Sequence, residues 1–235
     1  AENFHGWMGN FKSRFLFSSW ESDDKMILYR RTALGTAYNT RDVGVMLDYK
    51  IGPVLAIAQL QNGDDSAGEE WAITGKAILT AIGKTIDKQS GGYGPDAETA
   101  LTFGLGYFDD SNVDDTSAIT AEAMFASGPF WASGEIVDHD EGFTGLTGGP
   151  AQAADGLGDT TPWSGTAAFM LSDNFELVGR YQDADDDADT TTLLGGVNYY
   201  VNGHATKWQF NYSATDSDDT DLDGDLLTLG LVVAV

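Results

Sequence analysis

Apolar and polar side chains alternate along most of the chain, and this period of two predicts β-strands. The clearest run is Lys207-Trp208-Gln209-Phe210-Asn211-Tyr212-Ser213, in which the aromatic residues share one face and the polar residues share the other. From residue 227 to residue 235, Leu or Val occupies every second position. No helical stripe of comparable length is present, and no apolar run reaches the roughly 18 residues of a transmembrane helix. We therefore predict an all-β chain.

Twelve strands are predicted, an even number, and most have the roughly 10-residue length typical of outer-membrane barrels. Short turns alternate with long acidic connections along the chain. Among the short turns, Asn202-Gly203 is a strong hairpin signal. This alternation predicts an antiparallel up-and-down meander with its short turns at one end; residues 83–98 form a long connection at that end, which the pattern does not explain. The strands are expected at 3–11, 41–49, 53–62, 69–82, 98–108, 117–126, 129–138, 161–172, 174–183, 190–201, 204–214 and 225–235; the long connections at 62–70, 109–116, 138–160, 183–189 and 215–225.

The composition of the polar face separates a membrane barrel from a soluble β-sandwich or a lectin-like domain. That face carries mainly Thr, Ser, Asn, Gln and Gly, with few charges, whereas a soluble protein would present many charges there. Aromatic residues occur near the predicted strand ends, where interfacial girdles lie in membrane barrels; they are Trp71, Phe108, Phe130, Trp163, Phe175, Tyr181 and Trp208. The pattern favours a transmembrane β-barrel with lipid outside and water inside.

Charge and composition exclude several classes of function. The formal charge of −25, from 37 acidic and 12 basic residues, leaves no basic surface for nucleic acid. The chain has no cysteine, so disulfides, thiolate metal sites and Cys nucleophiles are excluded. The three histidines, His5, His139 and His204, lie far apart in the sequence. Because no spacing pairs a nucleophile with a base, we do not expect an enzyme.

Two motifs near the start of the chain resemble the phosphate-selective porin O/P family. Gly9-Asn10-Phe11-Lys12 matches that family's strand end "G-x-F-K", and Arg41-Asp42-Val43-Gly44-Val45-Met46-Leu47 matches its strand start "G-R-D-x-G-V-x-L". The following hairpin at Gly52-Pro53 and its exit at Asn62-Gly63 are also similar. The resemblance implies a homotrimeric outer-membrane channel with a long loop that folds into the lumen, narrows it and binds anions through basic side chains.

This chain departs from the family pattern in two respects. Members usually have about sixteen strands, with the matching motif well inside the chain. We therefore expect either a twelve-stranded barrel or the C-terminal part of a sixteen-stranded barrel. The strongly negative charge is the second departure. Residues 11–41 nevertheless carry a net charge of +3, against −28 for the remainder.

The candidate constriction loop, residues 11–40, accounts for most of the predicted anion-binding site. The predicted pore cations are Lys12, Arg14, Arg30, Arg31, Arg41, Lys76, Arg180 and Lys207, and the predicted pore acids are Glu122, Glu135 and Glu176. Low-dielectric walls would focus the field of the loop cations on passing ions, and Arg suits oxyanions through its bidentate geometry. In the alternative interpretation, the loop cations form salt bridges with Asp42, Glu21 or Asp23 and hold the loop in place.

The inward charges on the strands also have two interpretations. Opposed acids and bases would orient water and dipolar solutes in an open lumen, or they would form cross-strand ion pairs that fill a narrow barrel. An open channel predicts unpaired charges, whereas a closed structural barrel predicts that Lys76, Arg180 and Lys207 are each neutralised by an inward carboxylate.

The acidic connection near the end of the chain copies the opening of a calcium loop at Asp219, Asp221, Asp223 and Gly224. Gly230 stands where an EF-hand requires Glu, so only weak calcium binding is expected. Solvation of an exposed loop is the simpler interpretation of these acids. No other cofactor is predicted.

We therefore predict a porin of the bacterial outer membrane that conducts small ions and hydrophilic solutes passively, with a preference for anions at the loop. The expected partners are outer-membrane lipid, lipopolysaccharide and two further copies of the chain. The alternatives are a cation-leaning general porin and a non-conducting structural or adhesin-like outer-membrane protein.

Overall fold

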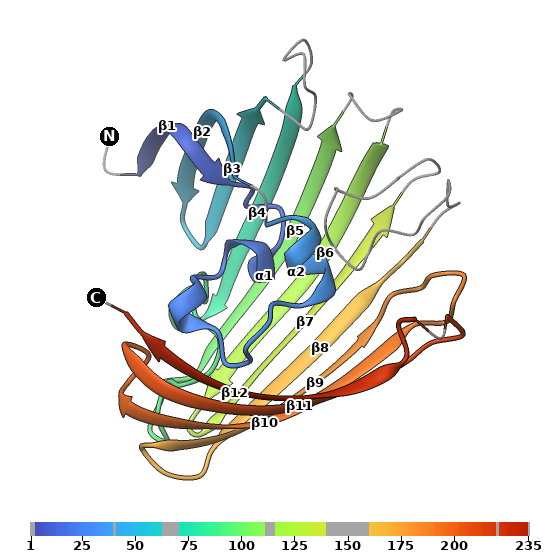
Figure 1. Cartoon of the computed structure of the whole chain (residues 1–235). Helices are drawn as coiled ribbons and strands as arrows, with labels where there is room; N and C mark the ends of the chain where they lie inside the picture. Colours follow the sequence, from blue (N-terminus) through green and yellow to red (C-terminus); the bar gives the residue numbers. More distant parts are fainter. Residues whose placement is uncertain are drawn as a thin grey trace.

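The computed structural model describes residues 3–39, 41–62, 71–110, 116–139, 160–219 and 221–234. Twelve strands form one antiparallel sheet in which each strand pairs with its neighbours in sequence order (Figure 1). The elements are β1 (Phe4–Lys12), α1 (Phe17–Trp20), η1 (Asp23–Lys25), α2 (Ala33–Ala37), β2 (Arg41–Ile51), β3 (Val54–Gln61), β4 (Ala72–Ile82), β5 (Ala100–Asp110), β6 (Thr116–Ser127), β7 (Phe130–His139), β8 (Trp163–Met170), β9 (Phe175–Asp183), β10 (Thr191–Asn202), β11 (Thr206–Asp216) and β12 (Gly224–Val233).

All twelve predicted strands are present, and each observed boundary lies within three residues of its prediction. The predicted all-β antiparallel fold is therefore confirmed. The long connections predicted at 62–70, 109–116 and 138–160 fall mostly on residues 63–70, 111–115 and 140–159, which lie outside the described residues.

Alternation places apolar side chains outside and polar side chains inside. In the β11–β12 pair, the cross-strand partners Trp208 and Leu231, and Phe210 and Leu229, all face outward. The next residues along β11 face inward and are buried. The turn from β10 to β11 requires a backbone φ of +51° at Gly203, a value that glycine adopts without strain. The alternation of side chains and the glycine turn are therefore both consistent with the observed pairing of the strands.

The sheet curls around α1 and α2, which lie on its concave side (Figure 1). Within the described residues, β1 pairs only with β2, and β12 pairs only with β11. The curled sheet is therefore open along one side, between the β1 and β12 edges.

Two long connections fold onto the concave face. The first, residues 13–39 between β1 and β2, contains α1, η1 and α2, and we call it the inner loop. It begins two residues later than predicted, because β1 continues through Lys12. The second, residues 83–99 between β4 and β5, enters from the short-turn end, and we call it the strap.

The inserted segments bury the inward face of the sheet and supply much of its apolar contact. Phe17, Ile27 and Leu28 of the inner loop and Ile86 of the strap share one apolar cluster with wall residues such as Trp131. The lumen beside these residues is therefore packed with protein. No helix in the described residues is long and apolar enough to cross a membrane.

If the outward face contacts lipid, a charge at its centre will be costly. Leu105 lies in the middle of β5 and is 64% exposed. We expect Leu105→Lys to lower the free energy of unfolding in phospholipid vesicles by about 2 to 4 kcal/mol, measured by urea titration. The matched control is Leu171→Lys, in the turn after β8, where the exposed fraction is similar and the expected loss is small. Equal effects at both positions would contradict a lipid-facing belt.

Candidate functional site

Three inward cations of the wall donate hydrogen bonds to backbone carbonyls of the inner loop. Lys76 Nζ donates to the Phe15 carbonyl at 3.0 Å, and Arg180 Nη1 donates to the Arg30 carbonyl at 2.8 Å. Lys207 Nζ donates to the carbonyls of Asp24, at 3.0 Å, and Met26. These three cations, predicted to line the pore, contact the inner loop.

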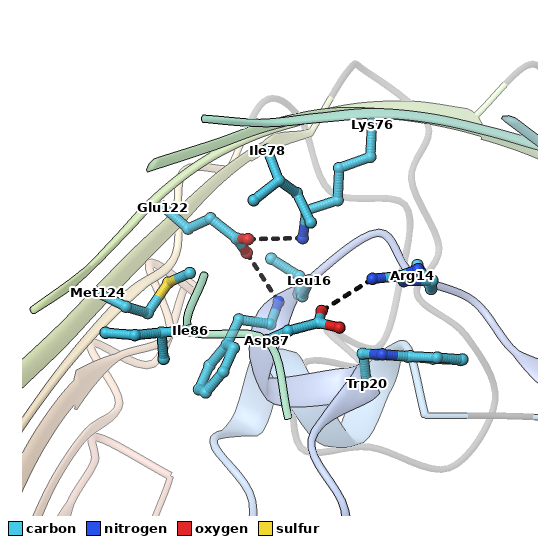
Figure 2. A pocket seen from close by; sticks show the side chains of 10 residues that line it. Arg14, Leu16, Trp20, Lys76, Ile78, Ile86, Asp87, Glu122 and Met124 are labelled. Atoms are coloured by element: carbon cyan, nitrogen blue, oxygen red, sulfur yellow. Dashed lines mark hydrogen bonds and ion pairs between the residues drawn. The ribbon is translucent and has the colours of Figure 1, made fainter. Parts of the chain in front are cut away.

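Inward carboxylates of the wall accept from the inserted segments. Glu122 Oε2 accepts from the Phe17 amide at 2.7 Å, while its Oε1 lies 2.6 Å from Lys76 Nζ (Figure 2). Glu135 Oε1 accepts from the hydroxyls of Ser18, at 2.8 Å, and Thr32, at 2.5 Å. Of the predicted pore acids, Glu122 and Glu135 therefore contact the inner loop as the cations do, whereas Glu176 accepts from the Gly92 amide of the strap at 2.7 Å.

Neutral amide side chains complete the contact between wall and inner loop. Gln59 accepts from the backbone amide of Arg14 at 2.8 Å, and Gln182 accepts from that of Ala33 at 2.7 Å. Asn211 accepts from the backbone amide of Tyr29 at 2.9 Å. We did not single out these wall residues from the sequence; their inward positions in the alternation are the only signal that marks them.

Most cations near the inner loop are engaged in contacts. Arg14 pairs with Asp87 of the strap at 2.8 Å and lies 4.7 Å from the centre of the Trp20 ring (Figure 2). Arg31 donates to the Ser18 and Glu21 carbonyls and pairs with Asp23. Lys12 Nζ also pairs with Asp23, at 3.5 Å.

Arg30 and Arg41 differ from these cations because both are exposed. In the described part of the chain, neither takes part in an ion pair within 4.0 Å, so Asp42, a salt-bridge partner in the alternative interpretation, does not pair with either of them. Arg30 lies over the Tyr29 ring, with its guanidinium carbon 5.2 Å from the ring centre.

A cavity of about 840 Å³ separates the inner loop from the wall formed by β9 to β12. Arg30 and Tyr29 line it on the loop side. The facing wall contributes five hydroxyl or amide side chains and Asp225 from β12, together with Leu194, Leu222 and Leu226; the hydroxyl and amide residues are Gln182, Thr190, Thr192, Ser213 and Thr215. The cavity therefore has a mixed polar and apolar lining, with Arg30, Arg31 and Asp23 on the loop side and Asp225 on the wall side.

The inward charges are neither unpaired, as an open channel predicts, nor all neutralised by carboxylates, as a closed structural barrel predicts. Among the described residues, Lys76 has the buried carboxylate partner that a closed structural barrel requires. Arg180 and Lys207 instead donate to loop carbonyls, to the Thr166 hydroxyl and to His204 Nδ1. The role of these residues in permeation stays a prediction.

The inner loop also carries a buried carboxyl that contacts the strap. Glu21 Oε1 accepts from the Ser90 amide at 2.9 Å and from the Ser90 hydroxyl. Burial raises the pKa of Glu21, although the hydrogen bonds from Ser90 act in the opposite direction. The sequence pattern does not predict this contact between Glu21 and Ser90.

The predicted calcium residues lie in the connection before β12; Leu222 of that connection and Gly224 at the start of β12 line the cavity. Asp219 Oδ1 accepts from the backbone amide of Asp221 at 3.0 Å, and the three acids are exposed. Among the described residues, no group of three or more acidic or histidine side chains is arranged to hold a metal ion. Calcium binding stays a prediction.

Comparison with known proteins supports the fold assignment. No family model matches the chain, and no curated protein matches its sequence. A loop-deletion mutant of OmpT, an outer membrane protein of Vibrio cholerae, superposes with a TM-score of 0.60 at 15% identity, over 98% of this chain and 75% of that one. The outer membrane channel DcaP of Acinetobacter baumannii gives 0.55 at 16% identity, over 97% and 70%.

OccK10 (OpdN) of Pseudomonas aeruginosa gives a TM-score of 0.53 at 14% identity, over 81% of this chain and 60% of that one. The chain therefore spans only part of the length of these similar structures. The architecture that it shares with them is that of bacterial outer-membrane β-barrels, so the predicted fold class is confirmed.

The Lys76–Glu122 pair provides a test of how the wall holds the inner loop. Both side chains are almost fully buried, so Lys76→Met leaves a buried charge without its partner. We expect a loss of about 3 to 5 kcal/mol in the free energy of unfolding, measured by urea titration in vesicles. The double variant Lys76→Met, Glu122→Gln removes that charge and keeps an acceptor for the Phe17 amide, so it should recover much of the loss. No recovery would contradict this explanation.

The buried Glu21 carboxyl predicts a pH dependence of stability. Because its pKa is higher in the folded than in the unfolded state, the unfolded state loses its proton first as the pH rises. The free energy of unfolding of the native chain should therefore fall, relative to that of Glu21→Gln, as the pH rises through the unfolded and then the folded pKa. Parallel urea titrations from acidic to neutral pH measure this difference, and a constant difference would contradict the prediction.

Proposed function

We propose that this chain forms a porin-like channel for small hydrophilic solutes across the bacterial outer membrane. The cavity between the inner loop and the β9–β12 wall is the observation that carries the proposal. Hydroxyl, amide and charged side chains line it together with three leucines, Leu194, Leu222 and Leu226. The inner loop beside it is held by at least nine wall-to-loop hydrogen bonds. Rigid, partly polar surfaces of this kind suit passive diffusion. The likeness to the channel DcaP supports the same conclusion.

The cavity also supports a preference for anions, as the resemblance to the phosphate-selective porin O/P family implies. Arg30 is exposed to the cavity, and its guanidinium has no carboxylate partner among the described residues. In a confined space with low-dielectric walls, one such cation raises the local concentration of anions. Asp225 on the opposite wall and Asp23 on the loop side act against it. Arg30 is therefore the residue on which anion selectivity would depend most.

Planar-bilayer recording with a potassium chloride gradient tests the proposal. We expect conductance, and a reversal potential that shifts toward cation selectivity in Arg30→Gln. Arg41→Gln is the matched control because it removes the same charge from an exposed position that is not among the described residues lining the cavity. Arg31 is unsuitable, because its substitution would also break contacts within the inner loop.

The outcomes separate the alternatives. A reversal potential that changes equally in both variants would contradict a specific role of Arg30. Cation selectivity in the native chain would favour a general porin controlled by its acidic connections. No conductance from correctly folded protein would contradict the channel and favour a structural barrel.

A further inference from the structure

The strap crosses the concave side of the sheet from one wall to the other. It leaves β4 and β5, where the Ile86 amide donates to Thr102 Oγ1 at 3.0 Å. Its tip reaches β9, where the Gly92 amide donates to Glu176 Oε1 at 2.7 Å. The return arm lies against the β6–β7 turn, where the Gly128 amide donates to the Ala97 carbonyl at 2.8 Å. The strap therefore spans the lumen near the short-turn end.

The strap and the inner loop enter from opposite ends and are joined where they meet. The Arg14–Asp87 pair and the two Ser90 hydrogen bonds to Glu21 link their side chains. Two cations, Arg14 of the inner loop and Lys88 of the strap, each lie 4.7 Å from the centre of the Trp20 ring. Such contacts each contribute modestly, but together they connect the two segments into one unit.

The tip of the strap fits closely into the wall. Gly92 has a backbone φ of +60°, and a Cβ there would lie against His204 Nε2 and within 2.9 Å of the Tyr200 hydroxyl. Glu176, which accepts from the Gly92 amide, also accepts from the Tyr200 hydroxyl at 2.5 Å. Glycine at this position is therefore required both by the backbone conformation and by the space available.

We propose that the strap is a second constriction, which narrows the short-turn end of the channel and is held in place by its contacts with Glu21 and Glu176. This inference rests on the proposed channel function and adds to it. Solutes that pass the cavity at the long-connection end reach the strap before they leave the barrel. Release of the strap tip from the wall widens this exit, so residues 83–99 set the conductance together with the inner loop.

Thiol labelling tests the docking of the strap without any assay of transport. The chain has no cysteine, and Ser90 is only 3% exposed, so Ser90→Cys introduces a single buried thiol. We expect slow reaction with a maleimide in reconstituted vesicles. Adding Gly92→Ala should release the tip and accelerate labelling about ten-fold, equivalent to about 1.4 kcal/mol. Adding Gly94→Ala is the matched control, because its backbone φ of +87° imposes similar strain, whereas a Cβ there meets no atom within 4 Å. Equal labelling rates in the Gly92→Ala and Gly94→Ala variants would overturn the proposed docking.

Single-channel recording of the same variants, without the cysteine, tests the constriction. We expect higher conductance in Gly92→Ala than in Gly94→Ala, and the highest conductance when residues 84–98 are replaced by an Asn-Gly turn. Unchanged conductance in a variant whose labelling shows a released tip would overturn the second constriction while leaving the channel intact. If the variant without the strap folds and does not conduct, the channel function itself is contradicted.

Discussion

An irregular segment inside a β-barrel needs a partner for every buried backbone amide and carbonyl, because an unpaired buried group costs free energy comparable to a lost hydrogen bond. The inner loop meets this constraint through side chains of the wall rather than through its own short helices. Lys76 and Lys207 donate to its carbonyls, and Glu122 and Asn211 accept from its amides. The donors and acceptors on the polar face of the sheet thus complement the backbone groups of the inner loop in one conformation. The cavity depends on this match, because it is the space that the anchored loop leaves open.

The same principle explains why the lumen is unequally filled. Toward β5 to β8, the inner loop and the strap pack against the wall through apolar residues such as Phe17, Ile86 and Trp131. Toward the long-connection end of β9 to β12, hydroxyl, amide and leucine side chains of the wall line the cavity. Apolar contact and buried ion pairs therefore stabilise one side of the lumen, and the cavity lies on the other side.

Strict alternation was sufficient to predict the strands, their order and the direction of each face. It was also sufficient to place Lys76, Arg180 and Lys207 on the inside. Alternation carries no information on what an inward charge meets, however, so a lysine that contacts a loop carbonyl and one that faces water look alike. Arg30 and Arg31 are neighbours in sequence, yet only the folded loop distinguishes the exposed cation from the anchoring one.

The strap was beyond the reach of the sequence for a different reason. Apolar and polar residues do not alternate regularly in the strap. Its glycines indicate turns, but they do not indicate which part of the sheet those turns contact. Its partners Glu21 and Glu176 are separated from it by 69 and 84 residues. These contacts form only because the curling of the sheet brings residues that are far apart in the sequence close together.

The two free edges of the sheet have a consequence for its closure. β1 runs from the short-turn end toward the long-connection end, and β12 runs in the opposite direction, so the edge strands are antiparallel to each other. A ladder that closes the sheet antiparallel throughout can join them directly or through inserted hairpins, never through a single extra strand. Every closed antiparallel barrel built on this sheet therefore has an even number of strands. Any inserted hairpin is connected to β12 or β1 at the short-turn end, which the strap crosses.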